Sequence, residues 1–595
     1  MKFECTINGA RLDCVVTSNR DIARPVFCTS GMTRMTVVEG GEMLTQTGSY
    51  IEVRLPDLQA GKACAFSLGY DGFKPANRAW MPLGPYLRTN DATVIQLPPV
   101  PSGFHPAPDT PAKAFFGLKL IPQPTSWSPT GQTVLVSGYS CENDAMRSVA
   151  ALAQRQNHSI FLHPDGHRVI IETGNLPLDA YTLVITPDDI TLTAAGTGGW
   201  FYGAITLLML LRTHDGDIPC GTLTDSPRFT WRGQHLDCAR HFYKPDTIHD
   251  LLDLMALLKL NRFHWHFADD EAFRLQVACL PELWQQTEMR GEGHLIPAIF
   301  SGTSESGGSY SKDDARAVIA HAKTLNIEVM PEIEVPAHAL ALAKVYPDTR
   351  DPNDTGSERS VQGYTANVVN PAMPKTWDIL EALSIEVGAL FPFGLLHLGC
   401  DELPTDTWMG SPLAKALMAK EGLETTQDLQ GWTTSRLAQT VVKNGQRPAA
   451  WEEAAQGKNG GIGHNAILFS WTGAGPGLAA ARAGYNVVMT PAQHVYLDMA
   501  HTNDIDDWGA NWAGAVSLSD TIAWDVIPPD EPELAKHIIG VQGTFWSEFT
   551  TQDAQLWPML VPRILGVASK GWQSHDLTSA DLHSLATDFA RVWRN

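Results

Sequence analysis

Two adjacent acids, Asp401 and Glu402, follow a short apolar segment that ends in glycine. Residues 395–399 have the composition of a buried strand, which would bring both carboxyl groups to one site at its end. Two carboxylates in one low-dielectric pocket do not ionise freely together, so one tends to keep its proton near neutral pH. Such a pair suits general acid catalysis with an electrostatic partner. The simpler alternative is a solvated Asp-Glu pair in a loop.

Other acidic, aromatic and basic residues stand at the ends of strand-like segments along the chain. They are Arg240, Asp269, His338, Trp451, Trp471, Tyr496, Asp498, Trp546 and Glu548. Each alone has a structural reading, such as core packing for a tryptophan or an ion pair for an arginine. Together they predict an acid-lined pocket with aromatic walls. Aromatic faces stack on the C–H face of a sugar, and arginine and carboxylates bind its hydroxyl groups. The pattern indicates chemistry on a glycoside.

An alternation of strands and helices must position these residues. Eight strands are predicted, at 233–237, 262–267, 327–333, 395–399, 447–451, 466–471, 485–490 and 538–546. Helices are predicted between them, among others at 248–260, 313–325 and 378–390. This order predicts an α/β fold, a (β/α)8 TIM barrel, in which chemistry takes place at the C-terminal ends of the strands.

Two further domains are predicted ahead of the barrel. Residues 1–110 show short β-type runs separated by Gly, Asp and Asn, typical of an antiparallel β-sandwich, and end in a proline-rich link. Residues 111–226 mix strands with helices at 144–156 and 200–211, which predicts an α+β accessory domain. Residues 227–595 then form the catalytic barrel.

Composition narrows the class of partner. The chain of 595 residues carries a formal charge of −22, which argues against nucleic acid or an anionic membrane as partner.

Its nine cysteines include no CxxC pair, which favours a reducing compartment. The first residues lack the apolar run of a signal peptide, and the longest apolar run, near 204–211, is too short to span a bilayer. We therefore expect a cytoplasmic protein.

Four ordered motifs resemble one known family. They are Arg-Gly-Gln-His-Leu-Asp-Cys-Ala-Arg-His-Phe at 232–242, Lys-Leu-Asn-Arg-Phe-His-Trp-His at 259–266 with Asp-Asp at 269–270, His-x-Gly-x-Asp-Glu at 397–402, and Gly-Thr-Phe-Trp-Ser-Glu at 543–548. All four resemble the family 20 glycoside hydrolases, the β-N-acetylhexosaminidases. The resemblance covers about residues 115–575, and it is loose over the first hundred residues.

The resemblance implies roles at the matching positions. Glu402 is the implied general acid and base, Asp401 orients and polarises the acetamido group of the substrate, and Tyr496 donates a hydrogen bond to the acetamido oxygen. The implied substrate-binding residues are Trp451, Trp471 and Trp546 as sugar walls, Arg240, Asp498 and Glu548 on the hydroxyl groups, Asp269 and His338 as supports near the acid, and Trp408 as the platform for the leaving-group sugar.

The family's pattern is not matched everywhere. Glu334 stands where an Asp is common, Ala337 and Cys400 stand where Gly is common, and Phe-Ala at 267–268 replaces a Leu-Thr type pair. None of these changes removes a catalytic group. The longer Glu334 side chain affects the carboxylates near His338, so the departure bears on the pH profile.

The implied activity is exo-acting, retaining hydrolysis of a terminal β-linked N-acetylglucosamine or N-acetylgalactosamine. Family 20 enzymes are exceptions to the two-carboxylate scheme, because the acetamido group of the substrate acts as nucleophile and forms an oxazolinium intermediate. The partner would be an oligosaccharide or glycoconjugate, without cofactor or metal ion. One alternative is a metal-dependent barrel hydrolase, with ligands among His264, His266, His338, His397 and Asp401. The other is a non-catalytic sugar-binding protein.

Overall fold

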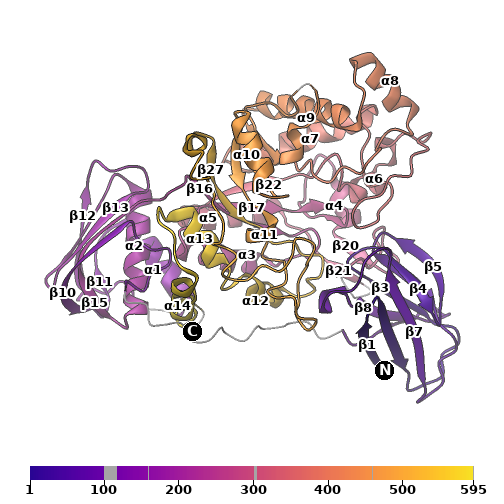
Figure 1. Cartoon of the computed structure of the whole chain (residues 1–595), viewed down its shortest axis with the longest axis horizontal. Helices are drawn as coiled ribbons and strands as arrows, with labels where there is room; N and C mark the ends of the chain where they lie inside the picture. The colour runs from indigo at the N-terminus through magenta and orange to yellow at the C-terminus, as the bar shows by residue number, and fades with distance from the viewer. Residues whose placement is uncertain (100–116, 158–159, 301–304, 459, 594–595) are drawn as a thin grey trace.

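The computed structural model of this chain describes all residues except 100–116, 158–159, 301–304, 459 and 594–595. Figure 1 shows three units, with the eight-stranded barrel between the N-terminal domain and a second, smaller domain. The predicted boundary between residues 110 and 111 lies outside the described residues. On the other side of the second domain, its last strand ends at Asp225 and the first barrel strand begins at Trp231.

The N-terminal domain consists of two antiparallel sheets. One has the order β1 (Lys2–Asn8), β2 (Arg11–Thr17), β7 (Ala63–Tyr70) and β4 (Met35–Glu39); the other has the order β5 (Glu42–Thr47), β6 (Tyr50–Arg54), β3 (Val26–Ser30), β8 (Leu83–Arg88) and β9 (Val94–Gln96). Alternate residues of β2 are buried, as expected for a strand with one face on the core. Phe27 lies in that core against Phe3 and Phe66. The predicted sandwich is confirmed.

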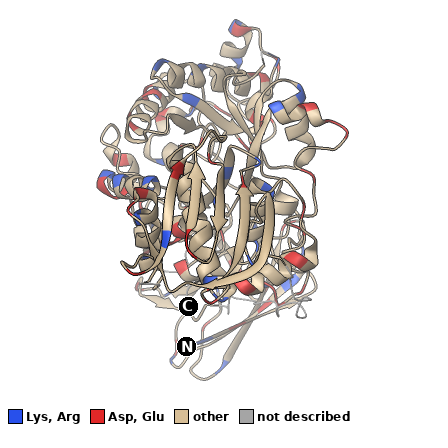
Figure 2. Ribbon diagram, turned by 90° about the vertical axis from the view of Figure 1, so that its left-hand side faces the viewer, with Lys and Arg blue, Asp and Glu red and all other residues tan. Residues whose placement is uncertain are grey.

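The second domain is a six-stranded sheet with two helices on one face. Its strand order is β10 (Ser126–Leu135), β15 (Asp217–Asp225), β13 (Tyr181–Ile185), β14 (Ile190–Ala194), β12 (His167–Thr173) and β11 (Tyr139–Ser140). Helix α2 (Thr197–Thr213) is buried nearly all round because it packs against the sheet, against α1 (Asp144–Arg155) and against the barrel helix α3 (Pro245–Leu257). Figure 2 looks onto the other face of this sheet. The predicted α+β unit with an apolar helix is confirmed.

Eight parallel strands close into the predicted barrel. In order they are β16 (Trp231–Asp237), β17 (Arg262–His266), β22 (Glu328–Glu332), β23 (Leu395–His397), β24 (Arg447–Trp451), β25 (Ile467–Ser470), β26 (Asn486–Met489) and β27 (Ile538–Gly543). Each pairs with its sequence neighbour, and β27 pairs with β16. All eight correspond to predicted strands. The structure therefore confirms the TIM barrel.

Helices surround this barrel close to the predicted positions. They include α3, α5 (Lys312–Thr324), α7 (Pro374–Leu390), α9 (Thr426–Lys443), α10 (Ala474–Arg482) and α13 (Ile564–Trp572). Helix α3 begins three residues before the expected start, because Pro245 suits the first helical turn although the apolar pattern begins only at Ile248. It ends before residue 260, where Lys259 adopts a left-handed backbone with φ +58°. Among the helices that the structure describes, none has the length and apolar character that crossing a bilayer requires.

Candidate active site

A cavity of about 320 Å³ lies at the C-terminal ends of the barrel strands. Its volume is at the lower end of the range typical of small-ligand sites. We call it the active-site pocket. Nine of the residues predicted from sequence line it: Arg240, His338, Asp401, Glu402, Trp471, Tyr496, Asp498, Trp546 and Glu548. They come from six of the eight strand ends, as a TIM barrel requires.

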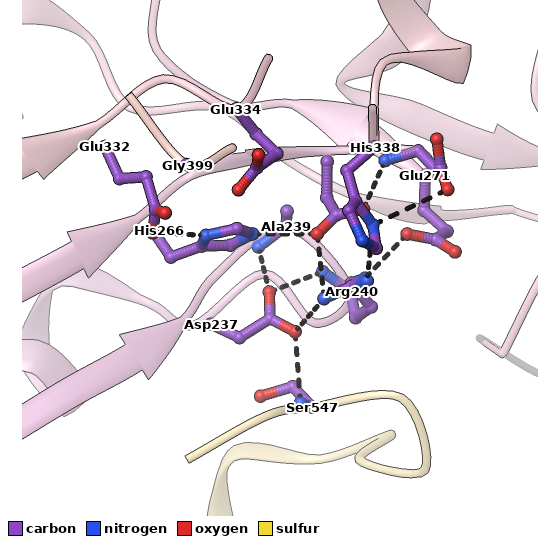
Figure 3. Close-up of polar contacts among 12 residues, drawn as sticks. Asp237, Ala239, Arg240, His266, Glu271, Glu332, Glu334, His338, Gly399 and Ser547 are labelled. Atoms are coloured by element: carbon purple, nitrogen blue, oxygen red, sulfur yellow. Dashed lines mark hydrogen bonds and ion pairs between the residues drawn. The ribbon is translucent and has the colours of Figure 1, made fainter. Parts of the chain in front are cut away.

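The turn after β23 brings the two acids into the pocket. Backbone φ angles of +71° at Gly399 and +48° at Glu402 reverse the chain, so that both Asp401 and Glu402 line the cavity. A side chain at position 399 would be strained at this φ, and its Cβ would lie 1.8 Å from a Glu334 carboxylate oxygen, so the Glu334 side chain would have to move. Figure 3 shows Glu334 beside this glycine. A left-handed conformation at a non-glycine residue such as Glu402 is typical of a functional site.

His338 connects Glu402 to a chain of buried charges. Its Nε2 atom lies 3.3 Å from a Glu402 carboxylate oxygen, and its Nδ1 atom lies 3.0 Å from Asp269. The other Asp269 oxygen lies 2.9 Å from His266 Nε2, and His266 Nδ1 lies 2.6 Å from Glu332. Figure 3 shows part of this network around His266 and Glu332. This series of contacts fixes the orientation of the His338 ring beside Glu402.

Nearby charges and burial have opposite effects on the pKa of His338. Burial disfavours the imidazolium, but Asp269, Glu402 and Asp401 outweigh it and raise the pKa of His338 well above 6.5. The ring is therefore positive at neutral pH. Burial raises the pKa of Asp401 to about 6, against the lowering effect of the His338 charge. Asp401 Oδ1 is buried and has no hydrogen-bond partner among the described protein groups. It is a free acceptor in the pocket for a substrate N–H.

Three carboxylates hold Arg240 at the floor of the pocket. Its guanidinium group lies 2.8 Å from Asp269. It also lies 2.8 Å from Glu271 and 3.3 Å from Asp237, both of which Figure 3 shows. The group also lies over the ring of Trp546, at 5.3 Å from its centroid. An arginine restrained in this way loses little conformational freedom when it binds a hydroxyl group.

Two further carboxyl groups line the same pocket. Burial, more than any neighbouring charge, raises the pKa of Glu548 to about 7, and burial together with the charge of Glu548 raises the pKa of Asp498 well above 3.8. Asp498 Oδ1 is also buried and without a hydrogen-bond partner among the described groups. A carboxyl group whose pKa is raised keeps its proton to higher pH, and in that state it can donate to a sugar hydroxyl as well as accept from one.

Aromatic residues form the predicted walls. The rings of Trp471 and Tyr496 are nearly parallel, at 17°, with centroids 6.4 Å apart. Tyr496 also lies 6.5 Å from the ring of Trp546. Trp471 Nε1 donates to Glu453 at 3.1 Å, which fixes the plane of the indole. Burial raises the pKa of Tyr496 well above 10, so its hydroxyl group remains a hydrogen-bond donor.

Three predicted site residues do not line the pocket. Trp451 is fully buried; its Nε1 donates to Glu332 at 3.0 Å and its ring lies 5.9 Å from that of Trp546, so it supports the wall from beneath. Trp408 is 2% exposed and donates to the Val369 carbonyl at 3.1 Å within an apolar cluster. Neither residue lines the pocket of this structure, so the sugar wall at Trp451 and the platform at Trp408 stay predictions from the resemblance. Asp269 lies behind the pocket and contacts Arg240 and His338, the supporting position implied for it.

The alternative set of metal ligands does not meet at one point. Candidate ligands among the described residues fall into three groups: His235 with His266 and Glu332, His264 with Glu332 and His397, and Asp269 with Asp270 and His338. Four of the five ligands considered from sequence are divided among these groups, and the fifth, Asp401, belongs to none. The arrangement does not provide the single metal centre of that alternative.

Sequence reasoning missed part of the pocket. Its lining includes residues of the N-terminal domain and of the loop after Tyr496, namely Met32, Thr33, Phe73, Trp80, Asn511 and Trp512. No motif marks the N-terminal residues, which lie in the connections between strands; Trp80 ends the short 3-10 helix Arg78–Trp80. A tryptophan in the glycine- and asparagine-containing run 508–514 was the one available signal for Trp512. Glu332 and His266 were visible at strand ends, but their connection to His338 was not.

Comparison with known proteins places this geometry in a family. The model "Glycosyl hydrolase family 20, catalytic domain" matches residues 229–575, and "Glycosyl hydrolase family 20, domain 2" matches residues 117–226. A β-hexosaminidase of Vibrio furnissii is 32% identical over 86% of this chain and 85% of the relative. A β-hexosaminidase of Akkermansia muciniphila is 31% identical over 67% of this chain and 80% of the relative.

Solved structures agree. The exo-β-N-acetylglucosaminidase of Vibrio harveyi, in complex with N-acetylglucosamine, is 27% identical and superposes with a TM-score of 0.87, covering 99% of this chain and 98% of that one. The two family models match adjacent parts of the chain, domain 2 first and the catalytic domain after it. The barrel, the Asp-Glu turn and the aromatic walls agree with these matches. This chain therefore belongs to glycosyl hydrolase family 20.

Proposed function

We propose that this protein is a β-N-acetylhexosaminidase that removes a terminal β-linked N-acetylhexosamine from the non-reducing end of an oligosaccharide or glycoconjugate. The curated relatives at 32% and 31% identity are named β-hexosaminidases. The observation that carries the proposal is the Asp401–Glu402 pair beside a positive His338, with the buried Asp401 Oδ1 unpartnered among the described groups. This arrangement supplies a proton donor and an acetamide acceptor side by side.

The mechanism follows from these positions. Glu402 donates a proton to the glycosidic oxygen, and Asp401 accepts the acetamido N–H and stabilises the positive charge that develops on it. The acetamido carbonyl oxygen of the substrate attacks the anomeric carbon from within the sugar, the bond to the leaving oxygen breaks, and an oxazolinium ion forms. Water then opens this ring as Glu402 accepts its proton, with net retention. Tyr496, protonated and buried, donates to the acetamido oxygen.

His338 helps Glu402 to change roles. Its positive ring lies 3.3 Å from the Glu402 carboxylate and is oriented by Asp269 at 3.0 Å. This contact holds the Glu402 carboxyl group in one orientation while it first donates a proton and later accepts one from water. The same charge moderates the cost of burying Asp401 beside another acid.

The floor of the pocket predicts exo-action. Arg240, held by three carboxylates, lines the pocket together with Asp498 and Glu548, and both Arg240 and Asp498 are buried. A chain that continued beyond the first sugar would collide with this floor. We expect chitotetraose to yield N-acetylglucosamine and chitotriose as the first products, measured by chromatography at low conversion. Early release of the disaccharide would contradict exo-action, and absence of any hydrolysis would favour the sugar-binding alternative.

The charge of Asp401 predicts the acid limb of the pH profile. Its pKa is raised to about 6, chiefly by burial. The residue polarises the acetamide only when it is ionised, so we expect kcat/KM to fall as the pH falls below about 6. Rates on an aryl N-acetylglucosaminide between pH 4 and 8 measure this limb. Asp401→Asn, which cannot titrate, should flatten it; an unchanged limb in that variant would assign the titration to another group.

A cytoplasmic location remains part of the proposal. All nine cysteines are free, and most of them are buried or half-buried. This arrangement is stable in a reducing compartment. Fractionation of cells that produce the protein checks the location, and activity in an extracellular or periplasmic fraction would contradict it.

A further inference from the structure

Two buried arginines lie against the turn that carries Arg240. Arg274 is 0% exposed, and Arg290, in β20 (Met289–Gly291), is 2% exposed. Arg274 Nη2 donates to the Ala239 carbonyl at 2.8 Å, and Arg290 Nη2 donates to the Arg240 carbonyl. Figure 3 shows this turn at Ala239 and Arg240. The two guanidinium groups therefore hold consecutive carbonyl groups of one turn.

Part of each guanidinium group has no acceptor. Arg290 Nε, Arg290 Nη1 and Arg274 Nε are buried and have no hydrogen-bond partner among the residues that the structure describes. Arg563, another buried arginine, differs in this respect, because its Nε, Nη1 and Nη2 atoms all donate to backbone carbonyl groups. Buried N–H groups are rarely left without an acceptor, since they lose their hydration without compensation. Arg290 above all has donors available for a further ligand.

The charges of these two arginines are also poorly paired. Glu271 and Asp237 are the acids that act on the charge of Arg290. Both bind Arg240 instead, at 2.8 Å and 3.3 Å, and the other Glu271 oxygen accepts from a tyrosine hydroxyl group. Burial and repulsion by Arg290 lower the pKa of Arg274 to about 9. A water molecule would satisfy the N–H groups but would not balance the charge, whereas an anion does both.

We propose that a small inorganic anion, with the size and charge of chloride, binds beside Arg274 and Arg290 and accepts hydrogen bonds from their free N–H groups. A monoatomic ion suits side chains that are almost completely buried, because a phosphate ion would need room for a tetrahedron of oxygen atoms. Charged donors make strong hydrogen bonds to an anion. The proposed site is distinct from the active-site pocket, whose lining includes neither arginine.

The anion site is connected to the substrate through Arg240. Arg290 holds the backbone of this residue, and the Arg240 side chain lines the active-site pocket. An anion that balances the two buried charges keeps the turn in one position. This consequence rests on the proposed function, in which Arg240 binds a hydroxyl group of the sugar. We expect removal of the anion to raise KM about fivefold or more, the lower end of typical coupling between two sites, with a smaller change in kcat.

Crystallography on the full-length protein, purified in gluconate buffers without halide, tests the site directly. In crystals equilibrated with sodium bromide, we expect an anomalous peak beside Arg290 at the bromine absorption edge. Data collected at long wavelength, without bromide, detect any chloride that the protein has kept through purification. Electron density without an anomalous signal in both experiments would identify a water molecule and overturn the site.

Thermal unfolding and kinetics show whether the ion acts in solution. As sodium chloride replaces sodium gluconate at constant ionic strength, the Tm of the wild-type protein should rise and its KM for an aryl N-acetylglucosaminide should fall. Arg290→Gln, which removes the charge, should lose both responses. The matched control is Arg316→Gln, whose side chain is exposed on α5 and which should keep both responses.

The outcomes separate the anion site from the proposed function. Chloride retained in gluconate-purified protein, or a bromide peak with responses that Arg290→Gln loses, supports the site. A bromide peak without any response means binding at crystal concentration only and overturns the inference, as do responses that Arg290→Gln keeps. The anomalous signal and the Tm do not depend on turnover. A failure to hydrolyse any N-acetylhexosaminide would therefore overturn the proposed function and leave the anion site to be judged by these two measurements.

Discussion

Glu402→Gln is expected to lower kcat/KM on N,N'-diacetylchitobiose by about 10²–10⁴-fold, the range typical of lost general acid catalysis. The loss on an aryl N-acetylglucosaminide with an acidic phenol should be far smaller, because such a leaving group departs with little protonation. Glu402 lines the pocket 3.3 Å from the positive His338 ring. Parallel kinetics on both substrates, with the exposed Glu533→Gln as control, measure the difference.

Equal losses of kcat/KM on the two substrates would show that Glu402 is not the general acid. A purely structural role predicts a different result, a fall in Tm with proportional losses on every substrate. Thermal unfolding of the same preparations distinguishes these cases. Gln is nearly the same size as Glu and retains a hydrogen-bond donor toward the leaving oxygen, so the variant removes little besides the transferable proton.

The second large effect concerns the nucleophile, which we expect the substrate to supply. A matched aryl glucoside without the 2-acetamido group should be essentially inert, since a well-oriented internal nucleophile accounts for about 7 kcal/mol or more of the barrier. Asp401→Asn should reduce kcat about 10²–10³-fold with a smaller change in KM, the size typical of losing one preorganised electrostatic group. A thiazoline mimic of the bicyclic intermediate should inhibit strongly.

Mass spectrometry of quenched enzyme provides the decisive measurement. During turnover of a 2-acetamido-5-fluoro glycosyl donor, we expect no covalent sugar on any acid of the chain. A stable adduct on an Asp or Glu would falsify substrate assistance and would require a carboxylate nucleophile across the sugar. The adjacency of Asp401 and Glu402 favours the expected result, because acids on one turn approach the sugar from similar directions.

Local sequence was enough to predict the barrel and the acid pair. Strand and helix periodicity is a property of neighbouring residues, and all eight barrel strands correspond to predicted segments. Residues at the C-terminal ends of parallel strands meet at one face of a TIM barrel wherever the strands lie in sequence. For this reason Arg240, His338, Tyr496 and Glu548 were predicted to share a pocket, and the structure places them in one.

Depth within the barrel was decided only by the tertiary structure. Trp451 and Trp471 both end a strand or directly follow one, yet Trp451 lies beneath Trp546 with its indole bonded to Glu332, while Trp471 faces the pocket. Sequence position tells which end of the barrel a side chain occupies but not which layer, because the layer depends on how far neighbouring strands are shifted and on which loops cover them. Trp408, in the loop after β23, is also buried, within an apolar cluster.

The residues of the N-terminal domain that line the pocket likewise could not be predicted from the sequence. The hydrogen bond from Trp80 to Asn511 joins residues 431 positions apart. Neither residue belongs to a motif, and both lie in connections between strands. Sequence patterns report which faces of an element are apolar, whereas contact between two loops depends on the orientation of whole domains. The acid pair of Asp401 and Glu402 is visible in adjacent residues of the sequence. The part of the pocket that is lined by both domains arises only where the two domains meet.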